Sequence, residues 1–205
     1  MDMVKYIFSA VFGYLIGSLS PSALISKVKN KDIRECGTKN LGATNVTLNF
    51  GKGLGVFVMI FDMAKAFSSF ELMQMLFEGN ELVGIVAGGA AVLGHVFSIY
   101  HGFRGGKGLA PFGGLVLAYD ARVFLFLLLT GLALMFIVNY AFILSFWGAF
   151  AFPFAVAIRG EDVLVLFVAL VASAVVFVKN YSNMLKAKNG EHKTIREYIR
   201  KTKNE

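Results

Sequence analysis

Residues that could bind a phosphorylated ligand are concentrated in two short polar segments of an otherwise apolar chain. The first segment, residues 34–45, reads RECGTKNLGATN. Its glycines allow a turn in which backbone N–H groups converge on an anion, and its hydroxyl and amide side chains add neutral donors. The segment therefore predicts an anion-binding turn, with a solvated basic loop as the alternative. The candidate residues are Arg34, Thr38, Lys39, Asn40, Gly42, Thr44 and Asn45.

The second segment, residues 94–108, reads GHVFSIYHGFRGGKG and lies where one apolar stretch ends and another begins. A glycine-rich turn that opens a helix presents backbone N–H groups to a phosphate, and a nearby lysine supplies the opposite charge. The predicted phosphate-binding residues are Lys107 with Gly105, Gly106 and Gly108. The segment is not a Walker A loop, because the spacing is one residue short and Gly108 stands where a magnesium-binding Ser or Thr belongs. A flexible connection between two helices is the alternative.

A carboxylate and an amine stand three residues apart near the middle of an apolar stretch, at Asp62 and Lys65. Each charge alone would cost about 2.5–3.5 kcal/mol at the centre of a bilayer, but this spacing puts both on one helix face, where they can pair. We expect a structural ion pair, with a proton or ion relay as the functional alternative. His95, at the end of the next apolar stretch, is predicted to be a hydrogen-bonded structural histidine.

Other kinds of chemistry lack the residues they need. The chain has one cysteine, Cys36, and three histidines, His95, His101 and His192, with no HExxH motif and no Cys/His cluster. We therefore predict no metal site and no cofactor. There is also no G-x-S-x-G motif and no convincing Ser/His/Asp set for nucleophilic catalysis.

The elements that position these residues are predicted to be membrane helices. Hydrophobic residues make up 57% of the 205 residues and charged residues only 16%, and the mean hydropathy is +0.66. The apolar residues form runs of about 20, the length that crosses a bilayer. No A-x-A-like cleavage site follows the first run, so it is predicted to be retained as a helix. The six stretches predicted to span are residues 3–25, 53–77, 82–100, 123–138, 141–158 and 163–178.

A seventh stretch, residues 108–119, is short for a span, and the distribution of charge decides whether it crosses. Basic residues crowd the loop 26–52 and the tail after residue 178, and the positive-inside rule places both in the cytoplasm. They share one side only if residues 108–119 cross. We therefore predict an all-α polytopic membrane protein with seven transmembrane helices, the N-terminus outside and the C-terminus cytoplasmic. The short helix is expected to pack inside the bundle.

The chain is predicted to be a single integral membrane domain, residues 1–205, that ends in a basic cytoplasmic tail, residues 179–205. Its net charge of +7 lies mostly on one membrane face, where anionic lipid headgroups attract it, so no nucleic acid partner is required. In the tail, Ile195, Tyr198 and Ile199 fall at helical spacing among basic residues, which predicts a short helix on the inner leaflet. The sequence specifies no oligomeric state.

The first apolar stretch carries small residues and a proline. Gly13 and Gly17 lie four residues apart on one helix face, and small residues let helices pack closely. Pro21 lacks a backbone donor and is predicted to kink the inner end of this helix.

Several of these residues occur in an order that resembles a known family. The motifs are Gly17-Ser-Leu-Ser-Pro21, Gly37-x-x-Asn-x-Gly-Ala-Thr-Asn45, Asp62-x-x-Lys65, and Gly94-His95 with Gly105-Gly-Lys-Gly108. Together they resemble the bacterial membrane acyl-phosphate:glycerol-3-phosphate acyltransferase family. The resemblance implies a seven-helix protein of the bacterial cytoplasmic (inner) membrane with its active site on the cytoplasmic side. It also implies transfer of a fatty acyl group from acyl phosphate to the 1-hydroxyl of glycerol 3-phosphate, giving lysophosphatidic acid and phosphate without a metal or an acyl-enzyme.

The resemblance also implies roles for individual residues. Lys107 and the neighbouring glycines would hold acyl phosphate. The residues that would orient the acceptor and the reacting carbonyl are Thr38, Asn40, Thr44 and Asn45. Asn183 matches the asparagine of a third family motif, His-x-Glu-Asn.

The chain departs from the family pattern at several motif positions. Thr38 replaces a serine and Lys39 a glycine, while Leu48 stands where an arginine is expected. In the third motif Asn180 replaces the histidine and Ser182 the glutamate. Two further changes are Ser98 for a proline and Pro111 for a threonine. These departures leave two alternatives to an active enzyme: a non-catalytic relative that binds phosphorylated lipid precursors or a partner without turnover, and a small transporter that uses the Asp62–Lys65 pair.

Overall fold

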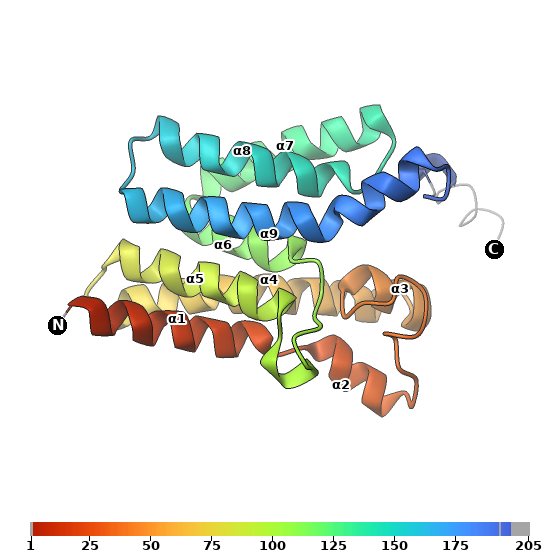
Figure 1. Cartoon of the computed structure of the whole chain (residues 1–205), viewed down its shortest axis with the longest axis horizontal. Helices are drawn as coiled ribbons and strands as arrows, with labels where there is room; N and C mark the ends of the chain where they lie inside the picture. The colour runs from red at the N-terminus through yellow and green to blue at the C-terminus, as the bar shows by residue number, and fades with distance from the viewer. Residues whose placement is uncertain (1, 193, 198–205) are drawn as a thin grey trace.

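The computed structural model describes residues 2–192 and 194–197, and within them the secondary structure is entirely helical. In chain order the helices are α1 (Asp2–Ser18), α2 (Pro21–Val28), α3 (Ala43–Phe50), α4 (Lys52–Leu76), α5 (Glu81–Val96), the 3-10 helix η1 (Ile99–His101), α6 (Leu109–Tyr119), α7 (Ala121–Val138), α8 (Ile143–Ile158) and α9 (Val163–Lys188). The long helices lie along one common axis, with the start of α1 and the end of α9 at opposite ends of the bundle (Figure 1). An integral membrane bundle is the architecture that this arrangement of apolar helices indicates.

In the part of the chain that the structure describes, five helical segments are long and apolar enough to cross a membrane. They are Met3–Val28, Lys52–Leu76, Glu81–His101, Ala121–Val138 and Val163–Lys188. Two shorter apolar helices, α6 with 11 residues and α8 with 16, complete the bundle. The helix in the predicted stretch 141–158 is shorter than the apolar run itself. Helix α7 ends at Val138, its cap residue Asn139 lies in the left-handed region (φ 68°), and α8 begins only at Ile143.

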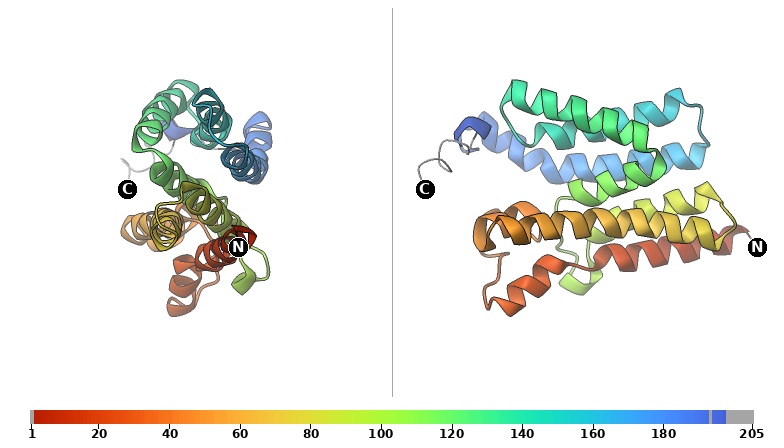
Figure 2. Two further views of the ribbon diagram at one scale, coloured as in Figure 1. Left: turned by 90° about the vertical axis from the view of Figure 1, so that its left-hand side faces the viewer. Right: turned by 180° about the vertical axis from the view of Figure 1, so that it is seen from behind.

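The short helix α6 lies between two groups of helices. Viewed end-on, α1, α4 and α5 form one group and α7, α8 and α9 the other, with α6 between them (Figure 2). Helix α6 contacts α4, α5, α7 and α9, and it buries Phe112, Leu115 and Val116. The prediction that the short helix packs inside the bundle is therefore confirmed.

Close packing of α1 against α5 depends on glycine, as predicted. A Cβ atom at Gly13 would lie 2.0 Å from the Ala87 carbonyl oxygen, and one at Gly17 would lie 2.1 Å from that of Ala91. Such distances are far below van der Waals contact, so no larger residue fits without moving a helix. This pairing fixes the inner end of α5, which carries His95 and leads into the second polar segment.

The chain breaks ahead of Pro21 instead of bending within one continuous helix. Helix α1 ends at Ser18, and Pro21 is the first residue of α2, a position where the missing N–H costs nothing. The Ser20 side chain caps α2 by accepting a hydrogen bond from Ala23 N at 3.3 Å. Because Ala23 N bonds this side chain, the Leu19 carbonyl is left for another donor, and Lys65 takes that place.

Helix α3 was expected to be part of a loop. It begins after Gly42 and ends at Gly51, whose φ of 96° favours glycine. Its buried Val46 packs with Ile33, Leu41 and Val58 in a small apolar cluster under the first polar segment. Thr44 and Asn45 are therefore helical residues. The helix was not predicted because this stretch is mostly polar and has a single narrow apolar face.

The basic tail leaves the bundle as an extension of α9, which continues ten residues beyond the predicted end of its span. Thr194 and Glu197 then form a reciprocal capping pair, with Thr194 N donating to Glu197 Oε2 at 2.8 Å and Glu197 N donating to Thr194 Oγ1 at 3.3 Å. Ile195 N donates to the Asn139 carbonyl at 3.1 Å. A helical start is thus present at the predicted place, while Tyr198 and Ile199 lie outside the described residues.

Candidate active site

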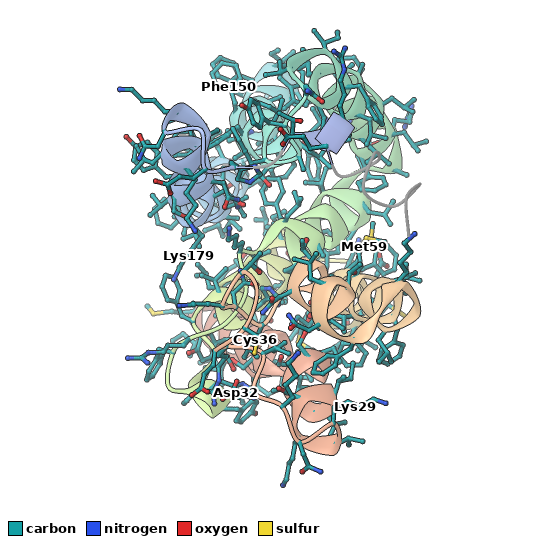
Figure 3. All side chains as sticks on the ribbon, turned by 90° about the vertical axis from the view of Figure 1, so that its right-hand side faces the viewer. Lys29, Asp32, Cys36, Met59, Phe150 and Lys179 are labelled. Atoms are coloured by element: carbon teal, nitrogen blue, oxygen red, sulfur yellow. The ribbon has the colours of Figure 1, made fainter. Side chains whose placement is uncertain are left out.

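The two polar segments meet at one end of the bundle. A pocket of about 370 Å³ is lined by residues of both segments: Asp32, Arg34, Glu35, Lys39, Asn40, Leu41, Arg104 and Gly105. Figure 3 looks onto this end, with Asp32 and Cys36 on the half built from the N-terminal helices and Lys179 of α9 pointing toward that half. Segments far apart in sequence therefore share one polar surface.

Asn45 holds the first segment in shape. Its side chain is fully buried, and its amide nitrogen donates to the carbonyls of Ile33 at 2.6 Å and Asn40 at 2.9 Å. Its Oδ1 accepts from Thr38 N at 2.9 Å. Since the amide nitrogen and the carbonyl oxygen are both engaged in the turn, Asn45 serves the segment by fixing its backbone.

Three other predicted residues of this segment are free to face a ligand. Asn40 lines the pocket, and its Oδ1 accepts from Gly42 N at 3.0 Å, which closes a tight turn. The side chains of Thr38 and Thr44 are exposed, and no hydrogen bond within the described residues uses either hydroxyl. The two hydroxyls can therefore donate to a polar ligand. The Asn40 amide nitrogen donates to the Thr38 carbonyl at 3.3 Å and has a second hydrogen for a ligand.

The cations around the pocket differ in how much of their charge is already paired. Arg34 binds Asp32 with two nitrogens, at 3.0 Å from Nε and 2.6 Å from Nη2. Hydrogen bonds from the side chain and backbone N–H of Arg34 lower the pKa of Asp32 to about 2, so this carboxylate stays ionised. Lys39 and Arg104 are exposed and make no ion pair within the described part of the chain. They supply the accessible positive charge.

Gly105 and Gly106 pack onto the end of α5. Gly105 N donates to the Val96 carbonyl and Gly106 N to the His95 carbonyl, each at 3.1 Å. A Cβ atom at Gly105 would lie 1.8 Å from the His95 carbonyl oxygen. The expected use of these two N–H groups in a phosphate cradle does not match this arrangement, since both already satisfy α5 carbonyls. The glycines are needed for close approach instead.

Free N–H groups occur one step further along, at the start of α6. Gly108 precedes the helix with φ 85°, and no side chain caps it. The first backbone bond of the helix runs from Phe112 N to the Gly108 carbonyl, and Pro111 has no N–H, which leaves the N–H groups of Leu109 and Ala110 unpaired in the described structure. A helix N-terminus of this kind attracts an anion.

Lys107 stands beside this helix start and contacts the end of α9. Its ammonium donates to Asn183 Oδ1 at 2.5 Å, and its backbone carbonyl accepts from Asn180 Nδ2 at 3.3 Å. Burial and the nearby Lys186 lower the pKa of Lys107, because both disfavour the charged form. An anion bound here would compensate that unfavourable charge.

The predicted ion pair of Asp62 and Lys65 is confirmed. Lys65 Nζ lies 2.8 Å from Asp62 Oδ1, and the two side chains are 3% and 2% exposed. His95 Nδ1 lies 3.3 Å from the same carboxylate oxygen, so the predicted structural histidine belongs to this cluster. The three residues connect α4 and α5 directly beneath the second segment.

Some site features were not predicted from the sequence. Arg104 lines the pocket, and the signal that could have identified it is its place immediately before the Gly-Gly-Lys-Gly turn. Asn180, noted only as a departure, is buried and links α9 to the Lys107 backbone. Leu48, where an arginine was expected, is half exposed on α3 and brings no charge.

The fold and site together define an integral membrane helical protein with a cationic, amide-rich site at one end of its bundle. The family model described as glycerol-3-phosphate acyltransferase matches residues 7–190. Relatives with that name include a protein of Aquifex aeolicus, 36% identical over 93% of this chain and 100% of its own length. One of Lactiplantibacillus plantarum is 33% identical over 91% of this chain and 90% of its own. The chain belongs to the glycerol-3-phosphate acyltransferase family.

Solved structures agree with this assignment over nearly the whole chain. The crystal structure of PlsY (YgiH), an integral membrane glycerol 3-phosphate acyltransferase, in its glycerol 3-phosphate form has a TM-score of 0.85 and 33% identity, covering 93% of this chain and 95% of that one. Its lysophosphatidic acid form has a TM-score of 0.82 and 32% identity. The shared fold therefore covers nearly all of the helices that position the two polar segments.

Proposed function

We propose that this protein transfers a fatty acyl group from acyl phosphate to the 1-hydroxyl of glycerol 3-phosphate, giving lysophosphatidic acid and phosphate. Family membership supports the reaction, and one observation about this chain carries it. Residues of the two cationic polar segments, 34–45 and 94–108, line one pocket although they lie far apart in the sequence. The second segment leads directly into the uncapped start of α6. Both substrates carry a phosphate, so a site of this composition suits both.

We assign the donor phosphate to the start of α6. There Lys107 offers an ammonium, Leu109 and Ala110 offer backbone N–H groups, and Asn183 orients the ammonium. The acceptor phosphate then belongs in the neighbouring pocket, where Lys39 and Arg104 are accessible and Asn40 adds an amide. Thr38 and Thr44 present free hydroxyls near the acceptor.

The proposed reaction requires alignment of the two substrates more than covalent catalysis by the protein. The acceptor hydroxyl oxygen bonds to the acyl carbonyl carbon, and the bond from that carbon to the phosphate oxygen breaks. Phosphate leaves with the electron pair of that bond and takes up the proton of the hydroxyl. Acyl phosphate is already activated, so no acyl-enzyme is required, and the protein contributes by positioning the two substrates. Lys107 and the α6 N–H groups stabilise the negative charge that grows on the departing phosphate.

We further propose that seven helices cross the bacterial inner membrane, with the N-terminus outside and the site in the cytoplasm. The alternating direction of successive long helices and the opposite positions of the start of α1 and the end of α9 support an odd number of crossings (Figure 1). The basic first loop and the basic end of α9 lie at the same end as the pocket, as the positive-inside rule requires for the cytoplasmic face.

A direct assay tests the reaction. Purified protein in detergent is supplied with acyl phosphate and labelled glycerol 3-phosphate, and labelled lysophosphatidic acid is measured. We expect product from the wild-type protein and a loss of at least about a hundredfold in Lys107→Ala, comparable to removing one donor to a developing oxyanion. The matched control is Lys29→Ala, an exposed lysine at the same end of the molecule, which should retain activity. Binding of both substrates without any product would contradict the proposal and favour a non-catalytic relative.

A further inference from the structure

Three ionisable side chains that the proposed reaction does not use meet under the Gly105–Lys107 turn. They are Asp62 and Lys65 of α4 and His95 in the last turn of α5, all buried. The Lys65 ammonium contacts three groups. It lies 2.8 Å from Asp62 Oδ1, donates to the Leu19 carbonyl at 2.8 Å and lies 2.9 Å from His95 Nδ1. Its three hydrogens therefore have three neighbours.

This environment determines where His95 carries its proton. The Leu19 carbonyl can only accept a hydrogen bond, so it takes one hydrogen of the Lys65 ammonium. The Asp62 carboxylate keeps Lys65 positively charged, because a buried carboxylate without an opposite charge is strongly unfavourable. Within the described structure Asp62 Oδ1 has no well-aligned hydrogen bond, so its contact with Lys65 is an ion pair. The remaining ammonium hydrogen faces His95 Nδ1 at 2.9 Å, a shorter contact than the 3.3 Å from Nδ1 to Asp62 Oδ1. Because an ammonium cannot accept a hydrogen bond, the shorter contact favours Nδ1 as the acceptor. A neutral imidazole that accepts at Nδ1 carries its hydrogen on Nε2.

The Nε2 atom of His95 faces the glycine-rich turn. A Cβ atom at Gly106 would lie only 2.1 Å from Nε2, so the ring edge contacts this glycine directly. Gly106 N donates to the His95 carbonyl at 3.1 Å, which ties the turn to the same residue. Within the described residues no hydrogen bond uses Nε2. A free donor is thus held one residue away from Lys107.

We propose that His95, held as the Nε2–H tautomer by Lys65 and Asp62, is a further phosphate-binding residue that presents an uncharged N–H donor at the turn beside Lys107. The choice of ligand, the phosphate group of acyl phosphate, rests on the proposed function. The tautomer matters because an Nε2 lone pair would face an anion with another acceptor. An Nε2–H adds a donor without adding a second buried positive charge next to Lys107.

Nitrogen NMR of histidine-labelled protein in detergent tests the tautomer without any need for turnover. The chain has only three histidines, so His101→Gln and His192→Gln assign the signals. We expect His95 to be neutral, with hydrogen on Nε2 and an accepting Nδ1, and its Nε2 signal to shift when inorganic phosphate is added. The double variant Asp62→Leu/Lys65→Met removes both charges together and should give mixed tautomers. An imidazolium, or hydrogen on Nδ1 in the wild-type protein, would overturn the proposal.

Two substitutions at His95 separate its donor from a merely structural role. In His95→Gln the amide nitrogen can reach the Nε2 position, whereas in His95→Asn it reaches only the Nδ1 position. We expect the KM for acyl phosphate to stay within about threefold in the first variant and to rise about tenfold or more in the second, with a smaller change in kcat. Equal KM values in two folded variants would overturn the proposal. If the NMR signature and phosphate response are present while no lysophosphatidic acid forms, the proposed function fails and this inference stands.

Discussion

Lys39 illustrates how a single residue can change both backbone and charge at the site. Its φ of 56° lies in the left-handed region, where the family pattern has a glycine and where a lysine is strained by about 1–2 kcal/mol. Two lysines at this end of the molecule, Lys39 and Lys179, could supply the positive charge that an arginine in place of Leu48 would bring. The Lys39 side chain lines the pocket, whereas Lys179 Nζ lies 4.6 Å from the centre of the Phe97 ring. Lys39 is therefore the cation better placed to compensate for Leu48.

We expect Lys39→Gly to raise the KM for glycerol 3-phosphate about fivefold, the equivalent of about 1 kcal/mol for one exposed charge contact, with little change in the KM for acyl phosphate. Lys39→Asn is the matched second variant, because asparagine also tolerates positive φ and also carries no charge, so it should raise the same KM. Steady-state kinetics with each substrate varied in turn measures both effects. If the two variants bind glycerol 3-phosphate as well as the wild-type protein does, the positive charge of Lys39 has no part in the site.

At the residue level the sequence identified two segments that the fold brings together, and it misjudged some side chains within them. The types and spacing of residues 34–45 and 94–108 indicate anion binding, and both segments reach the same pocket. The burial of Asn45 depends on carbonyls of Ile33 and Asn40 that the folded loop brings to it. The bonding of Gly105 and Gly106 depends on the end of α5. Contacts of that kind come from tertiary structure and leave no local pattern.

Among the elements, the apolar helices were predictable and α3 was not. Runs of about 20 apolar residues identify membrane helices because the bilayer core sets their length. Helix α3 has eight residues and only one strongly buried apolar side chain, Val46, so its composition reads as a polar loop. Its formation depends on packing against Ile33, Leu41 and Val58, which comes from outside the helix.

The contact between α1 and α5 predicts that the stability of the protein falls steeply with the size of the side chain at position 13. We expect Gly13→Ala to destabilise the protein by about 1–3 kcal/mol, because the new methyl group would overlap the Ala87 carbonyl, 2.0 Å away. Gly53→Ala is the control, since nothing lies within 4 Å of a Cβ atom there and alanine favours a helix. Thermal unfolding in detergent, followed by loss of the monodisperse peak in size-exclusion chromatography, compares the two. Equal stability of both variants would mean that α1 moves away from α5 at little cost.

At the end of the bundle opposite the site, a charged network joins the α6–α7 and α8–α9 turns. Arg159 donates to Asp120 Oδ2 at 2.6 Å and to Glu161 Oε1 at 3.2 Å. Burial raises the pKa of Asp120. Hydrogen bonds from Arg159 and from the N–H groups of Arg122 and Val123 lower this pKa by more than burial raises it, so it lies below its usual value. Ionised Asp120 therefore stabilises the fold.

The sign of this shift fixes its pH dependence. A carboxyl group with a depressed folded pKa contributes stability above the unfolded pKa of about 3.9 and loses it as pH falls through the folded value. We expect Asp120→Asn to lower the thermal stability at pH 7, by about 1 kcal/mol at most because Arg159 is half exposed. The difference from the wild-type protein should shrink below about pH 4 and vanish at lower pH. A difference that is constant between pH 3 and pH 7 would show that the charge of Asp120 does not matter.

For the whole molecule, the membrane topology depends on whether α6 crosses the membrane. The chain's single cysteine, Cys36, allows this crossing to be tested directly. Cys36 lies in the first polar segment, at the site end (Figure 3). Arg122, whose side chain is 94% exposed, is the second residue of α7, which begins at the opposite end of the bundle (Figure 1). The helices between the two residues that could cross the membrane are α4, α5 and α6, besides the short helices α3 and η1. Three crossings put them on opposite sides of the membrane, whereas two crossings put them on the same side.

We expect a membrane-impermeant maleimide to label Cys36 only when the cytoplasmic face is accessible, as in inverted membrane vesicles. In Cys36→Ser/Arg122→Cys the reagent should instead label the protein in intact spheroplasts. Solubilised protein controls for the reactivity of each thiol. Opposite labelling requires α6 to cross despite its 11 residues, which is possible because it lies among α4, α5, α7 and α9 and meets little lipid. Labelling of both thiols from one face would exclude the crossing of α6 and would place the end of α9 away from Lys107, against the contact of Lys107 with Asn183.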